Sequence, residues 1–81
     1  MRGTVALVNA DDAVIVVETE HGEYTVLGVM EDNALAVGDV IVGDLESLDY
    51  QVMDNETRGS RIAVYVEDTE LSLEEAREKL E

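Results

Sequence analysis

The chain has 81 residues, enough for one small domain with a single hydrophobic core. Twenty Asp and Glu residues against five Lys and Arg residues give a formal net charge of −15. This balance argues against general nucleic-acid binding, whose affinity comes mostly from cations that neutralise phosphates. It also argues against attraction to anionic lipid. Hydrophobic residues make up 46% of the chain, which excludes a disordered acidic tail.

Cysteine is absent, so the chain offers no disulfide, no thiolate metal site and no thiol chemistry. No apolar run approaches the about 18 residues of a membrane span, and the N-terminus lacks a signal-peptide core. We therefore expect a soluble, cytoplasmic domain. Thirteen residues are Val, whereas Phe and Trp are absent. Because Val favours pleated, half-buried surfaces, the composition predicts an all-β fold with an aliphatic core.

The first third of the chain has the pattern of an antiparallel meander. Three successive segments are rich in alternating apolar residues and are predicted as strands: residues 2–9, 13–20 and 23–30. Asn and Asp residues at 9–12 predict a turn between the first two strands, because their side chains bond to the nearby backbone. His21-Gly22 predicts a tight hairpin turn between the next two, since Gly adopts positive φ without steric cost.

The middle of the chain is harder to assign. Residues 31–38 are predicted as a loop with one helical turn around 33–36, and residues 39–46 as a fourth strand. Residues 46–58 fit either a continuation of that strand or an additional short strand that contains Val52. Residues 61–67 alternate cleanly and predict the last strand. These segments predict a small all-β domain of five strands, or six if Val52 has its own strand.

The C-terminus changes to a helical period, which divides the chain into a barrel domain over 1–68 and a short amphipathic helix within 69–81. Ser72 and Glu75 have the spacing of a capping box, and Leu71 with Ala76 that of a hydrophobic staple. So short a helix is not stable alone in water. Three of its residues share one face and should be buried against the barrel or a second copy: Leu73, Ala76 and Leu80.

Three short motifs follow one another within the first 22 residues. Arg-Gly-Thr-Val occupies residues 2–5, Asn-Ala occupies 9–10, and Glu-Thr-Glu-His-Gly occupies 18–22. With these motifs, residues 1–22 resemble the start of a cold-shock domain, a five-stranded OB-fold barrel. Residues 35–42 are similar to the entry of that family's fourth strand, with Leu, Gly and alternating Val in place.

The resemblance implies a small OB-like barrel that lacks the family's nucleic-acid-binding surface. Cold-shock domains stack single-stranded bases on exposed aromatic residues surrounded by Lys and Arg. The positions of this chain that match those aromatics hold no aromatic side chain: Leu7, Val14, Val16, Val26 and Gly28. Asp12 stands where the family tends to have Lys.

Four of these positions form the candidate interaction face, here called the aliphatic face: Leu7, Val14, Val16 and Val26. If the family register holds, this face is exposed on the barrel. A protein partner, a second copy of the chain or the chain's own C-terminal helix would then cover it. If the register is shifted by one residue, the same side chains belong to the core. The sequence leaves both alternatives open.

Three arginines are the candidate anion contacts of an alternative function: Arg2, Arg58 and Arg61. In that alternative the chain is a cold-shock-like protein that binds single-stranded nucleic acid through an atypical face. The Arg-Gly-Ser-Arg motif at 58–61 is also typical of a turn whose charges offset an acidic surface.

The remaining polar residues predict no catalytic residues, no metal site and no cofactor. His21 is interpreted as a turn residue beside Gly22, and the acidic clusters lack EF-hand spacing and are typical of a solvated surface. Crowded carboxylates are expected to have raised pKa values and to destabilise the fold at low salt. The acidity fits either a salty cytoplasm or a basic partner. The functional prediction is a non-enzymatic, acidic module for protein–protein interaction, and a small enzyme subunit is the least favoured reading.

Overall fold

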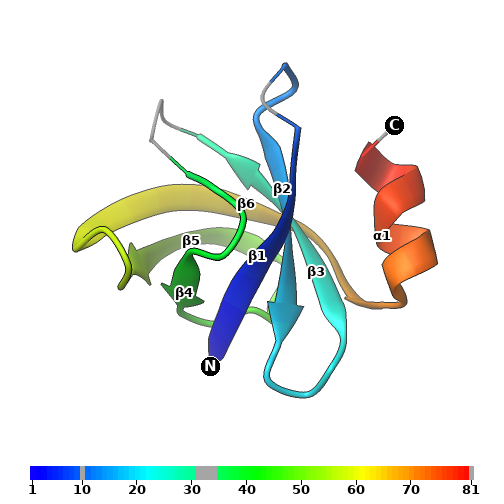
Figure 1. Ribbon diagram of the computed structural model, residues 1–81, viewed down its shortest axis with the longest axis horizontal. Coiled ribbons are helices and arrows are strands. Elements are labelled where there is room, and N and C mark those ends of the chain that lie inside the picture. Colours follow the sequence, from blue (N-terminus) through cyan, green and yellow to red (C-terminus); the bar gives the residue numbers. More distant parts are fainter. Residues whose placement is uncertain (10, 31–34, 81) are drawn as a thin grey trace.

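The structure is a computed structural model that describes residues 1–9, 11–30 and 35–80. Six antiparallel strands close into a barrel, and one short helix lies beside it (Figure 1). The elements are β1 (Arg2–Asn9), β2 (Val14–Thr19), β3 (Tyr24–Val29), β4 (Val40–Val42), β5 (Asp49–Asn55), β6 (Ser60–Leu71) and α1 (Leu73–Leu80). The order around the barrel is β1-β2-β3-β6-β5-β4, and β4 pairs with β1 to close it. The predicted all-β barrel is confirmed.

The first three strands form the predicted meander, and the predicted turn chemistry joins them. Between β1 and β2, the backbone N–H of Asp12 donates to Asn9 Oδ1 at 3.3 Å. Between β2 and β3, Gly22 has a φ of 79°, which an L side chain rarely adopts. The alternation of residues and the turn residues therefore suffice to place this part of the fold.

The fourth strand is shorter than predicted. It was expected over 39–46, but β4 spans only Val40–Val42, and a bend at Gly43 and a turn over residues 45–46 follow it. The side chain of Met53 packs so closely on Gly43 that a Cβ there would lie 2.5 Å from Met53 Cγ. After Gly43, Ser47 Oγ donates to Asp44 Oδ2 at 2.7 Å and closes a turn, while Leu45 enters the core.

The ambiguous segment around Val52 is a strand of its own, β5, so the barrel has six strands. The last strand, β6, is longer than the predicted 61–67. Residues 60–66 of this strand pair with β5 and residues 64–71 pair with β3, so β6 links both sides of the barrel. It continues past residue 68, where the domain boundary was predicted, to Leu71. Of the helical turn predicted around 33–36, residues 33–34 lie outside the described residues, and residues 35–36 are not helical.

The barrel interior is aliphatic, as the composition predicts. The buried core residues are Val5, Ile15, Val17, Leu27, Ile41, Leu45, Met53, Ile62, Val64 and Val66. Each fully buried side chain of this size contributes about 1.5–3 kcal/mol relative to an exposed one. Among the described residues, no helix is long and apolar enough to cross a membrane.

Candidate interaction surfaces

The aliphatic face lies on the outside of β1, β2 and β3, and α1 covers it (Figure 1). Leu7 pairs with Val16 and Val16 with Val26, so the three side chains lie in a row across the strands. Val16 and Val26 are buried because Ala76 of α1 packs on them, and Leu7 and Val14 are half-buried at the edge of the same cluster. The occupant of this face in the structure is therefore the chain's own helix, one of the alternatives that the sequence left open.

The predicted capping box and staple set the start of α1. The backbone N–H of Ser72 donates to Glu75 Oε1 at 3.1 Å, and the backbone N–H of Glu75 donates to Ser72 Oγ at 3.2 Å. Leu71 packs in the same cluster as Ala76, as a hydrophobic staple requires. These contacts fix the angle at which the chain leaves β6 and enters the helix.

The end of α1 is tied to the barrel by polar contacts. Asn9 Nδ2 donates to the carbonyl oxygen of Leu80 at 2.8 Å. Lys79 Nζ lies 3.5 Å from Asp68 Oδ2 of β6. A carbonyl at the helix C-terminus has no partner inside the helix, so the bond from Asn9 both satisfies it and holds α1 on the face.

One predicted helix contact is wrong. Leu73 was expected to be buried with Ala76 and Leu80, but 42% of it is exposed. Leu71, which precedes the helix, occupies the position next to Ala76 and leaves Leu73 on the solvent side of the first turn. The buried face of α1 is therefore narrower than the helical period predicts.

The three arginines proposed as anion contacts each lie within ion-pair distance of a carboxylate. The pairs are Arg2 with Glu56 at 2.8 Å, Arg58 with Asp39 at 2.7 Å, and Arg61 with Asp54 at 3.5 Å. A phosphate would have to compete with these carboxylates for each guanidinium. This arrangement is unfavourable for the alternative function in nucleic-acid binding.

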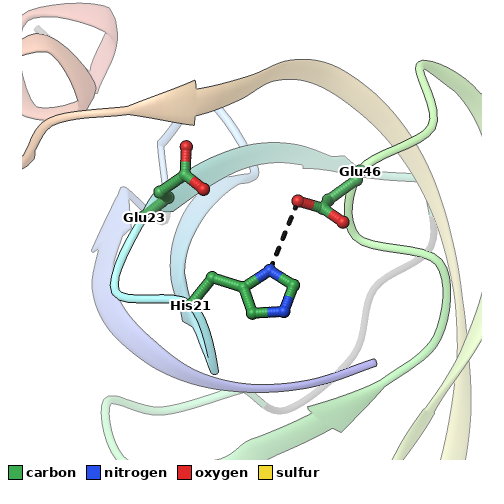
Figure 2. A group of neighbouring side chains, drawn as sticks. All are labelled: His21, Glu23 and Glu46. Atoms are coloured by element: carbon green, nitrogen blue, oxygen red, sulfur yellow. Dashed lines mark ion pairs between the residues drawn. The ribbon is translucent and has the colours of Figure 1, made fainter.

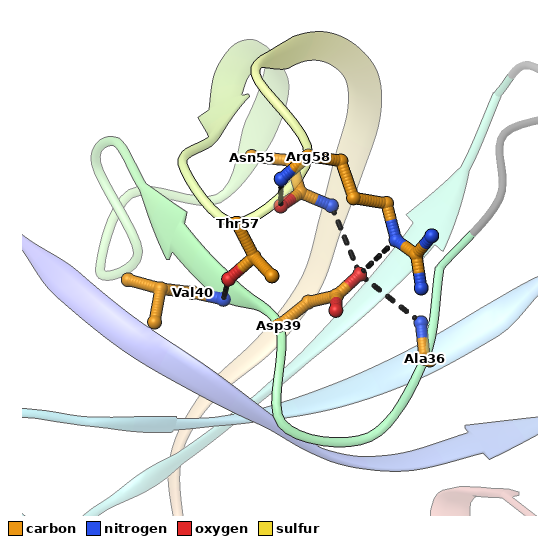
Figure 3. Close-up of polar contacts among 6 residues, drawn as sticks. All are labelled: Ala36, Asp39, Val40, Asn55, Thr57 and Arg58. Carbon is orange, nitrogen blue, oxygen red and sulfur yellow. Dashed lines mark hydrogen bonds and ion pairs between the residues drawn. The ribbon is translucent and has the colours of Figure 1, made fainter.

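Arg58 belongs to a polar network around the buried carboxylate of Asp39 (Figure 3). Asp39 Oδ2 accepts hydrogen bonds from Arg58 Nε at 2.7 Å, Asn55 Nδ2 at 3.1 Å and the backbone N–H of Ala36 at 3.2 Å. These bonds join the turn before β4 to the turn between β5 and β6. The structure therefore supports the turn interpretation of the Arg-Gly-Ser-Arg motif.

The network also sets the pKa of Asp39. Burial of the carboxyl acts to raise its pKa, but the hydrogen bonds from Arg58, Asn55 and Ala36 outweigh burial, and the net pKa is lowered. The pKa of Asp44 is lowered as well, chiefly by the hydrogen bond from Ser47. Both directions are opposite to the rise expected from crowded carboxylates, because local donors dominate over the diffuse negative charge.

A second apolar surface, not predicted as a site, lies on β5 and β6. We call it the tyrosine face; its large exposed side chains are Tyr50, Val52 and Tyr65. Tyr50 and Tyr65 stand directly opposite each other on the two strands, and their rings meet edge to face with centroids 5.1 Å apart. The exposed fractions of Tyr50 and Val52 are 66% and 68%, so both present most of their apolar area to solvent.

A carboxylate flanks the tyrosine face. Glu67 is exposed and follows Tyr65 on the same side of β6, whereas Asp49 is paired with the core residue Val66. The Glu67 carboxylate lies over Gly28, where a Cβ would be 3.1 Å from Oε2. Gly28 is also the residue of β3 paired with Tyr65, so the absence of a side chain at 28 leaves room for this carboxylate beside the ring.

The tyrosine face was not predicted from the sequence, because this face forms only where β5 pairs with β6. The alternation of Tyr50 and Val52 on one side of a strand was a usable signal, but the segment was not assigned. Comparisons with protein-family models, with curated proteins and with solved structures give no match for this chain.

Proposed function

We propose that this chain is a non-enzymatic interaction module that binds a positively charged protein segment through the tyrosine face. In this proposal the chain is an OB-like, cold-shock-like barrel in which an acidic surface has replaced the nucleic-acid surface. The single observation that carries the proposal is the exposed, edge-to-face pair of Tyr50 and Tyr65 on a strongly acidic barrel.

The chemistry of the tyrosine face suits a partner rich in Arg or Lys. Tyrosine is enriched at protein interfaces because it offers a large apolar area with few rotatable bonds. A guanidinium over a tyrosine ring gains about 0.5–2 kcal/mol from the cation–π interaction. Glu67 can pair with a further cation at the edge of the face. The net charge of −15 would in addition accelerate the encounter with a basic partner.

The same surface is a poor site for single-stranded nucleic acid. Tyrosine rings can stack on bases, but a bound strand also needs cations along its backbone. The three candidate arginines are paired with carboxylates, and α1 covers four of the five positions that match the family's stacking residues: Leu7, Val14, Val16 and Val26. The Glu67 carboxylate beside the rings would repel phosphates and attract guanidinium groups.

The proposal is tested by fluorescence anisotropy with a labelled Arg- and Lys-rich peptide at physiological salt. We expect the wild-type chain to bind, and Tyr50→Ala and Tyr65→Ala each to weaken binding at least about tenfold, or about 1.4 kcal/mol. Leu73→Ala is the matched control, because it removes an exposed apolar side chain from α1, away from the tyrosine face.

Two results would contradict the proposal. In one, the tyrosine variants bind the peptide as tightly as the wild-type chain does. In the other, a labelled single-stranded oligonucleotide binds more tightly than the peptide, which would assign the tyrosine face to nucleic acid instead.

A further inference from the structure

Two turns at one end of the barrel bring together a histidine and two glutamates. His21 and Glu23 come from the turn between β2 and β3, and Glu46 comes from the turn after β4 (Figure 2). His21 Nδ1 lies 3.6 Å from Glu46 Oε2. One potential ligand atom from each of the three side chains lies within 4.8 Å of the other two.

The backbone around His21 and Glu23 is held by hydrogen bonds. The backbone N–H of His21 donates to Thr19 Oγ1 at 3.3 Å. The backbone N–H of Thr19 donates to the carbonyl oxygen of Glu23 at 2.7 Å. Thr19 is buried, so this turn is anchored to the end of the barrel.

The turn that carries Glu46 is anchored independently. Leu45, the preceding residue, is fully buried in the barrel core. Its carbonyl oxygen accepts a hydrogen bond from the buried Thr25 Oγ1 at 2.9 Å. The backbone N–H of Glu46 itself donates to Asp44 Oδ1 at 3.3 Å. The three side chains therefore project from backbone that the fold already holds in place.

We propose that His21, Glu23 and Glu46 bind a divalent transition-metal ion such as Zn²⁺. An imidazole nitrogen with two carboxylate oxygens is a donor set that suits Zn²⁺ and its neighbours, whereas Mg²⁺ and Ca²⁺ prefer oxygen alone. Donors bound to one Zn²⁺ at about 2.1 Å lie about 3–4 Å apart, so the cluster needs only small side-chain rotations to close. Three protein ligands leave further positions for water or an external ligand.

The electrostatics favour a cation at this point. Glu23 and Glu46 place two carboxylates near one imidazole, in a chain whose net charge is −15. A divalent ion would neutralise both carboxylates and join the two turns through one centre. The sequence alone gave no sign of this site, because Glu46 is remote from His21 along the chain and only barrel closure brings them together.

The experiment is a titration of the full chain with Zn²⁺ alone, followed by calorimetry and by amide chemical shifts. We expect binding of one ion per chain, with shifts concentrated at both turns. His21→Gln and Glu46→Gln should each lower the affinity at least tenfold. Glu20→Gln is the charge-matched control: Glu20 is exposed beside His21 but is outside the ligand set, so this variant should keep the wild-type affinity.

Mg²⁺ and Ca²⁺ titrations separate a specific site from general attraction to an acidic surface. Much weaker binding of both ions than of Zn²⁺ supports the proposal. Equal binding of Mg²⁺ and Zn²⁺, or His21→Gln with unchanged Zn²⁺ affinity, would overturn it. Thermal melting of each variant without metal verifies that a loss of affinity does not come from unfolding.

Discussion

At the residue scale, Asp39 is the charged residue that is buried among the described residues. It accepts hydrogen bonds from a guanidinium, a side-chain amide and a backbone amide. Removal of the acceptor would leave buried donors unsatisfied, and Asn55 is itself almost fully buried. Each unsatisfied buried donor costs about 1–3 kcal/mol. The Arg61–Asp54 pair offers an exposed ion pair for comparison.

Asp39→Ala should therefore lower the free energy of unfolding by about 2–3 kcal/mol. Asp54→Ala, in which the exposed pair is lost instead, should lower it by less than about 1 kcal/mol. Urea unfolding followed by circular dichroism measures both values. Equal losses in the two variants would show that the Asp39 network does not hold the turns together.

The lowered pKa of Asp39 predicts how its contribution to stability depends on pH. Its folded pKa is lowered, so its contribution to stability is present above the unfolded value of about 3.9 and is lost as the pH falls through the folded pKa. The difference in stability between the wild-type chain and Asp39→Asn should be largest near neutral pH and should shrink in acid. A difference that grows as the pH falls would contradict the lowered pKa.

At the element scale, α1 is held by a small contact area, centred on Ala76 against Val16 and Val26. The capping box and staple were predictable because they depend on residues close together in the chain. The exposure of Leu73 was not predictable, because the path from β6 into the helix decides which turn faces the barrel. The same reasoning applies to the end of β4, where Gly43 lies against the side chain of Met53, a residue of a different strand.

Substitutions in α1 test this arrangement. Leu73→Ala should change the free energy of unfolding by less than about 1 kcal/mol, because the side chain is largely exposed. Ala76→Asp should release α1, because it places a charge against Val16 and Val26. Amide hydrogen exchange of residues 76–80 should be slow in Leu73→Ala and fast in Ala76→Asp. Fast exchange in Leu73→Ala would mean that Leu73, rather than Ala76, holds the helix.

At the scale of the whole molecule, local pattern predicts the barrel class but not its surfaces. The alternation of apolar residues, together with the turn residues, predicted β1, β2 and β3, because each hairpin depends on residues that are close in the chain. The tyrosine face and the cluster at His21 need the register between distant segments: Tyr50 meets Tyr65 only through the pairing of β5 with β6. Sites built from non-local contacts are therefore the part that the sequence did not show.

The net charge of −15 on a body with a radius of gyration of 10.8 Å predicts stabilisation by salt. The Debye length, over which charges interact, falls from about 30 Å at 0.01 M to about 3 Å at 1 M ionic strength. Repulsion between distant carboxylates should therefore disappear at high salt. The melting midpoint at pH 7 should rise between these two sodium chloride concentrations. The melting midpoint should rise less in a variant that carries Asp11→Asn and Glu78→Gln, two substitutions at exposed carboxylates. An unchanged wild-type midpoint would remove self-repulsion as a factor in stability.

We propose that a basic partner binds the tyrosine face while α1 stays in place. Mapping of amide chemical shifts during titration with the Arg- and Lys-rich peptide tests it directly. We predict shifts concentrated in β5 (Asp49–Asn55) and in the half of β6 that pairs with it, with the amides of α1 still protected from exchange. Shifts concentrated on β1, β2 and β3, together with loss of protection in α1, would contradict the claim and show that the partner displaces the helix from the aliphatic face.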